Sequence, residues 1–263
     1  TWINIGGLAA IFFAPISGML VSANSVVPVV RVLYLLFALT MMTKCFITYK
    51  FCHETRQGQV RKAETKGVSP FRMLGEYRQL IPMLLKNRAV VKAVAVSVLL
   101  YIANVVNTNF FSLYVTQRLG LSDNYLALFP ILNAGVMLVF MVGIQHKLNA
   151  LKFRAPLWVG LALYAVGALV LLLSPVGGLG FVLLNVFLTA VAASLVNPRK
   201  DALLQLNLDP QERARLNALI MASTVALSSP FGYLAGWLSS MDRRVAFGFM
   251  ILVFFLAMAV VGR

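Results

Sequence analysis

Residues Lys50–Lys92 read KFCHETRQGQVRKAETKGVSPFRMLGEYRQLIPMLLKNRAVVK, and this basic stretch decides the fold. Apolar runs of about 20 residues, long enough to cross a bilayer, lie on both sides of it. A segment with this much positive charge is retained on the cytoplasmic side of a membrane, which fixes the direction of every neighbouring span. Its charged residues are the cations Lys50, Arg56, Arg61, Lys62, Lys66, Arg72, Arg78, Lys86, Arg88 and Lys92 and the acids Glu54, Glu64 and Glu76.

The composition indicates a protein that crosses the membrane several times. Apolar residues make up 60% of the 263 residues and charged residues 12%, whereas soluble domains carry roughly 25% charged residues. We therefore predict an all-α, polytopic membrane helical bundle with eight transmembrane helices, the last six forming one six-helix half. The expected spans are 2–21, 27–48, 91–115, 126–144, 156–173, 179–196, 211–237 and 245–261.

Three segments follow from this pattern. Residues 1–49 are expected to be two transmembrane helices left from a truncated N-terminal bundle. Residues 50–90 form a basic cytoplasmic linker, with a surface helix that begins near Ser69 and Pro70. Residues 91–263 form the C-terminal six-helix transmembrane bundle.

The cations predict the orientation. With residues 50–90 and both termini in the cytoplasm, nineteen lysines and arginines lie inside and four outside, a strong bias at the cell (cytoplasmic) membrane. Arg243 and Arg244 are the one local violation. Although the net charge is +15, the cations lie between apolar spans, so the bilayer and its anionic headgroups account for them and nucleic-acid binding is not expected.

Enzyme and metal chemistry are not predicted. Cys45, Cys52 and His53 form a faint cluster at one helix end, which is too few ligands for zinc. The sequence shows no nucleophile paired with a base, so we predict no catalytic residues, no metal and no cofactor.

A short repeat connects two distant spans. Pro15 precedes Gly18-Met-Leu-Val-Ser22, and Pro230 precedes Gly236-Trp-Leu-Ser-Ser240. The two segments are six spans apart and run in the same direction, as two fused six-helix halves would leave them.

Two stretches carry a family resemblance. Residues 197–238, NPRKDALLQLNLDPQERARLNALIMASTVALSSPFGYLAGWL, and residues 53–58, HETRQG, resemble the major facilitator superfamily. The resemblance implies twelve helices, with the eight spans here as the fifth to twelfth and the N-terminal helices missing. It also implies a secondary active transporter that works by alternating access.

Two family motifs are poorly matched. The Gly-Pro-x-x-Gly-Gly core of the antiporter motif is replaced by Ala14-Pro15-Ile16-Ser17-Gly18-Met19, and Lys147 stands where the Gly-x-x-x-Asp-Arg loop has its acid. Antiport is therefore not predicted, and the substrate and any coupling ion are not identified.

Span 91–115 carries the clearest set of polar side chains, which share one helical face with aromatic rings. Amides and hydroxyls inside a membrane need a protein partner or a water-filled cavity, and such a face suits a small-molecule substrate. The alternative, hydrogen bonds to neighbouring helices, stays open. The predicted substrate-binding residues are Tyr101, Asn104, Asn107, Phe111, Asn133, Asn185 and Thr189.

Charges crowd the junction of spans 179–196 and 211–237. The resemblance implies an inner gate of ion pairs there, formed by Asp201, Glu212 and Arg215; a solvated charged loop is the alternative. All eight acids lie in links or at span ends, so any proton-coupling carboxylate is expected elsewhere. A non-transporting membrane scaffold or sensor on the same fold remains the alternative function.

Overall fold

The structure is a computed structural model that describes residues 26–53, 58–59, 81–82, 85–143, 154–208 and 213–262 and single residues at 20, 63 and 75. Within these residues the regular structure is entirely helical. The chain divides into two compact units, Thr1–Gln79 and Leu80–Arg263. The expected span at 2–21 and most of the expected surface helix lie outside the described residues.

The first unit contains α2 (Val26–Phe51). Its 26 residues rise about 39 Å at 1.5 Å per residue, which exceeds the roughly 30 Å of a bilayer core. Most of its large apolar side chains are exposed, including Tyr34 and Met42, as expected of a helix whose neighbour is lipid or another helix.

The described residues of the second unit form six long helices. The chain runs through α5 (Arg88–Leu113), a π-helical turn η1 (Tyr114–Arg118), a 3-10 turn η2 (Asp123–Ala127), α6 (Leu128–Gly143), α8 (Arg154–Leu172), α9 (Leu179–Asn207), α10 (Arg213–Met241) and α11 (Arg243–Gly262).

Seven helices of the described residues are long and apolar enough to cross a membrane, which confirms the all-α membrane class. The sequence placed α9 from 179 to 196, with Arg199–Asp201 as an extension. The structure continues α9 to Asn207, through Pro198 inside the helix.

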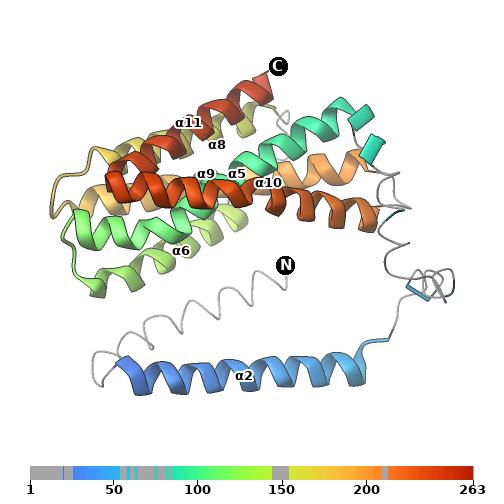
Figure 1. The fold of residues 1–263 in the computed structure, drawn as a ribbon, viewed down its shortest axis with the longest axis horizontal. Helices are drawn as coiled ribbons and strands as arrows, with labels where there is room; N and C mark the ends of the chain where they lie inside the picture. Colours follow the sequence, from blue (N-terminus) through green and yellow to red (C-terminus); the bar gives the residue numbers. More distant parts are fainter. Residues whose placement is uncertain are drawn as a thin grey trace. The chain divides into compact units, whose positions relative to one another are not determined.

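Four of these helices form a closed ring: α8 packs on α9, α9 on α5, α5 on α11, and α11 on α8. In addition, α6 packs on α9, and α10 packs on α5 and α11 (Figure 1). The core inside the ring is apolar and fully buried, as Val106, Leu161, Val182 and Phe247 show. The exposed side chains of α5, among them Asn104 and Asn107, lie outside this core.

The seam between α8 and α9 is built on glycine. A Cβ at Gly160 would lie 2.5 Å from Cγ2 of Val196, and a Cβ at Gly167 would lie 3.3 Å from Cγ2 of Thr189. Small residues let two helices approach closely and gain dispersion contacts. This seam therefore holds α8 and α9 closer together than larger side chains would allow.

One end of the second unit is closed by hydrogen bonds, and we call it the tied end. The Tyr114 hydroxyl donates to the Leu171 carbonyl (3.3 Å), and the Gly177 N–H donates to the Leu119 carbonyl (2.7 Å). Gly177 has φ +77°, a conformation that glycine adopts without strain. These bonds join the end of α5 to the turn between α8 and α9.

Candidate functional site

The polar face of α5 points away from the core of the six-helix unit. Tyr101 is 39% exposed, and Asn104 and Asn107 are exposed as well. The opposite face carries Ile102 and Val106, which are at most 2% exposed. The helix therefore separates its amides from its apolar residues, as its helical spacing predicts.

The two amides of this face have no protein partner among the described residues. Asn104 and Asn107 form no side-chain hydrogen bond there, whereas Asn109 donates from Nδ2 to the Val105 carbonyl of its own helix (2.8 Å). An unpaired amide is costly in hydrocarbon, so it needs water, a solute or another helix beside it. Asn104 and Asn107 are the two amides of α5 that can bind a solute without breaking a bond.

Phe111 adds an aromatic ring beside this face, but part of the ring is used in packing. The centroid of the Phe111 ring lies 5.5 Å from that of the Phe129 ring in α6. The two ring planes meet edge to face at 81°. Such pairs stabilise a fold by about 0.5–1.5 kcal/mol beyond burial. Phe111 is therefore half-buried between α5 and α6.

The structure places Asn185 and Thr189 in the seam between α9 and α8. Asn185 is 3% exposed, and its Nδ2 donates to the Gly167 carbonyl (2.8 Å). The Thr189 hydroxyl donates to carbonyls of its own helix, at Asn185 and Val186. Because Gly167 has no side chain, its carbonyl is open to the Asn185 amide. Asn185 and Thr189 therefore face α8 and are not brought together with Asn104 and Asn107.

Asn133 is half-buried in α6, which packs against α9. No hydrogen bond of its side chain is present within the described residues. Like Asn104 and Asn107, Asn133 has no protein partner among the described residues, but it lies on α6 and they lie on α5.

The predicted inner gate is described in part. Glu212 lies outside the described residues. Asp201 is exposed and lies 3.3 Å from Nζ of its neighbour Lys200, and Arg215 is half-buried in the first turns of α10. Near them, Arg199 is 7% exposed and donates to the Leu195 carbonyl (3.3 Å).

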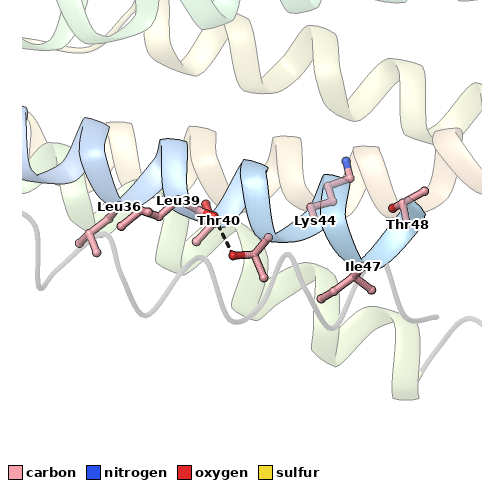
Figure 2. Close-up of a pocket in the computed structure, with 7 residues that line it drawn as sticks. Leu36, Leu39, Thr40, Lys44, Ile47 and Thr48 are labelled. Carbon is pink, nitrogen blue, oxygen red and sulfur yellow. Dashed lines mark hydrogen bonds between the residues drawn. The ribbon is translucent and has the colours of Figure 1, made fainter. Parts of the chain in front are cut away.

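A hollow of about 450 Å³ runs along one side of α2. Figure 2 shows that its lining side chains project from successive turns of this helix. The hydroxyls of Thr40 and Thr43 donate to the Phe37 and Leu39 carbonyls of α2 (both 2.8 Å), so they are already bonded. Among the described residues, the Lys44 ammonium and the Thr48 hydroxyl of this hollow have no hydrogen-bond partner.

Sequence reasoning missed the role of Arg243. Its guanidinium donates to Oε1 of Gln117 and to Oγ of Ser239, each at 2.9 Å. It therefore joins the π-helical turn after α5 to the end of α10 and the start of α11. The signal was present in the sequence, because Arg243 departs from the charge bias of the other links.

In the described part of the chain, no three His, Cys, Asp or Glu side chains gather where they could hold a metal ion. The described acids Asp123, Asp201 and Asp242 lie outside the polar face of α5. The face thus offers amides, hydroxyls and rings to a ligand, without a charge.

Comparison with known proteins identifies the family. Residues 2–232 match the model of the Major Facilitator Superfamily, which covers most of the chain. No curated protein and no solved structure matches the chain significantly. The family match and the seven apolar helices agree on a multi-pass membrane protein, and the chain belongs to the Major Facilitator Superfamily of membrane transporters.

Proposed function

We propose that this chain takes part in moving a small, uncharged polar solute across the cytoplasmic membrane by alternating access. In this proposal Asn104 and Asn107 of α5 bind the solute, with Tyr101 beside them. The observation that carries the proposal is a pair of exposed amides within an apolar helix that form no side-chain hydrogen bond among the described residues. A structural role would have paired them, as the α8–α9 seam pairs Asn185.

The chemistry of the face favours an uncharged solute. Amides donate and accept hydrogen bonds, and the phenol of Tyr101 can do both as well. A charged solute would need a counter-charge at membrane depth, and between Lys92 and Arg118 the span of α5 carries no charged residue. Sugars, polyols and amides match this face better than carboxylates or amines do.

The contacts of the other expected residues divide them into two groups. Asn133 and Phe111 remain part of the proposed lining, because Asn133 has no described partner and Phe111 is half-exposed. Asn185 and Thr189 support the site from behind through the α8–α9 seam. The proposed gate of Asp201, Glu212 and Arg215 would close the end of the unit where α9 ends and α10 begins.

The proposal is tested by ligand binding to the purified chain in lipid nanodiscs. A panel of sugars, polyols, amino acids and nucleosides is screened for thermal stabilisation, and a hit is followed by counterflow in vesicles. Asn104→Leu and Asn107→Leu should each weaken binding about 5- to 10-fold, the usual net value of one hydrogen bond.

Asn109→Leu is the matched control. Asn109 is an exposed asparagine on the same helix, and its amide is already bonded to Val105. It should leave binding within twofold of the parent chain. Equal effects of all three substitutions would contradict the site, and a stable chain that neither binds nor moves any of these solutes would favour a scaffold or sensor.

A further inference from the structure

A second cavity lies at the end of the six-helix unit opposite the tied end, and we call this the basic end. The cavity has a volume of about 240 Å³ and lies between α5, α8, α9 and α11. Four cations surround it, and they come from three different helices: Arg88, Lys92, Arg154 and Lys200. Its floor is apolar, formed by Ala93, Val96 and Leu157, which are 2–4% exposed.

The fold gathers these cations through the directions of its helices. Helices α5 and α8 begin at this end, and α9 and α11 finish here. Arg88 and Arg154 are the first residues of α5 and α8. They therefore line the same cavity as Lys200, which lies in the last third of α9. Lys92 follows Arg88 by four residues and so lies on the same face of α5. The beginnings of α5 and α8 add the positive ends of two helix dipoles.

Of the four cations, Lys200 alone pairs with an acid among the described residues. Lys200 pairs with Asp201 at 3.3 Å, and the Asp201 side chain is 65% exposed. Among the described residues no carboxylate lies within ion-pair distance of Arg88, Lys92 or Arg154. Like charges around one small space repel each other, so an anion bound there would lower the energy of this end.

An exposed tryptophan lies beside the cavity. Trp158 follows Leu157 in α8, is 46% exposed, and its Nε1 lies 3.6 Å from where a Cβ on Gly262 would be, at the end of α11. Tryptophan at a helix end is typical of the boundary between headgroups and hydrocarbon. The same two helices, α8 and α11, also carry exposed apolar side chains such as Val159 and Leu256, which suit contact with acyl chains.

We infer that the basic end binds an anionic phospholipid, with its phosphate among Arg88, Lys92, Arg154 and Lys200 and its acyl chains along α8 and α11. A basic pocket between transmembrane helices at headgroup depth is the arrangement that recognises anionic lipid. The volume of about 240 Å³ accommodates a headgroup and excludes a whole lipid. The inference is independent of the solute site on α5.

Fluorescence of Trp158 tests this site directly. In a Trp2→Phe/Trp237→Phe chain, Trp158 is the single tryptophan. The chain is reconstituted into phosphatidylcholine vesicles with increasing fractions of dibrominated phosphatidylglycerol or, separately, dibrominated phosphatidylcholine. We expect the anionic quencher to act at several-fold lower fractions than the neutral one.

Charge variants then identify the groups that bind. Lys92→Gln/Arg154→Gln should raise the fraction of phosphatidylglycerol needed for half-quenching by about 25-fold, because each cation contributes about fivefold. Lys92→Arg/Arg154→Lys should behave as the parent chain does. The matched control Arg31→Gln/Arg118→Gln removes two cations outside this cavity and should leave quenching unchanged, with helix content by circular dichroism equal in all variants.

Two results would overturn the inference. The first is equal quenching by the anionic and the neutral lipid in the parent chain, a measurement that requires no charge variant to fold. The second is full displacement of brominated phosphatidylglycerol by inorganic phosphate at constant ionic strength, which would make the cavity a site for free anions. Retention of the lipid in phosphate supports the lipid site.

Discussion

The two ends of the six-helix unit carry similar side chains and use them differently. At the tied end, Arg243 binds Gln117 and Ser239, and the Tyr114 hydroxyl binds the Leu171 carbonyl. At the basic end, Arg88 and Arg154 line an open cavity and have no described acidic partner.

The difference teaches how to separate structural from functional polar groups in a membrane helix. Where polar groups of neighbouring helices satisfy each other, they hold the fold together. Where they remain unsatisfied, they require lipid headgroup, water or solute. The same test separates Asn185, which is bonded, from Asn104 and Asn107, whose side chains have no hydrogen-bond partner in the described part of the chain.

The largest expected effect concerns which side of the membrane each end faces. In a Cys45→Ser/Cys52→Ser chain, a maleimide that cannot cross membranes should label Val176→Cys, in the α8–α9 turn at the tied end, in intact cells. Val176 is 71% exposed. Ala155→Cys, at the start of α8 at the basic end, should be labelled at least tenfold less until the cells are permeabilised, because positively charged ends stay in the cytoplasm.

The opposite pattern of labelling would reverse the orientation of every helix. In the parent chain, both cysteines are exposed, so Cys52, which follows α2 directly, serves as an internal check. It should react only after permeabilisation.

The next effect tests how far the tied end depends on its buried ring. Tyr114 is fully buried and packs 4.8 Å from the ring of Phe247. Tyr114→Ala removes this ring and leaves a cavity, which should lower the free energy of unfolding by about 3–5 kcal/mol. Unfolding in mixed micelles with increasing SDS, followed by circular dichroism, measures the loss.

Tyr125→Ala is the control for this substitution. Tyr125 lies in η2 and is 40% exposed, so its loss should cost less than about 1 kcal/mol, in the range of surface substitutions. A similar loss for the two tyrosines would mean that the tied end is no more tightly packed than the surface.

The sequence alone predicted the helices better than it predicted the contacts between them. Long apolar runs at 91–115 and 245–261 determine α5 and α11, because the bilayer requires helices of that length. The polar face of α5 was also predictable, since helical spacing brings Tyr101, Asn104 and Asn107 together.

Contacts that depend on a neighbouring helix were not predictable in this way. Asn185 looked equivalent to Asn104, and only the proximity of the Gly167 carbonyl distinguishes it. In the sequence, the four cations of the basic end indicate only which side of the membrane they lie on. That they surround one cavity follows from the packing of α5, α8 and α9, which no local pattern contains.

Asn185 provides the next test. Asn185→Leu keeps most of the side-chain volume but removes the bond to the Gly167 carbonyl, which should lower the stability by about 1 kcal/mol, within the range for bonds between membrane helices. Solute binding should stay within twofold of the parent chain, in contrast to Asn104→Leu. A loss of binding at unchanged stability would instead make Asn185 part of the solute site.

The smallest expected effect is the coupling between Arg243 and Gln117 at the tied end. Their bond of 2.9 Å is exposed, so water screens it and competes for both groups. In a double-mutant cycle, Arg243→Met and Gln117→Leu should each destabilise the chain, and the double variant should be less destabilised than their sum by about 0.5 kcal/mol. The cycle is needed because Arg243→Met also removes the bond to Ser239, which contributes to the single substitution but cancels in the coupling. A cycle on Arg88, the first residue of α5, and Gln117, in the turn η1 beyond its other end, should give no coupling. A coupling of zero for Arg243 and Gln117 as well would show that the tied end is held by Tyr114 and the Gly177–Leu119 bond, and that Arg243 serves α10 and α11 alone.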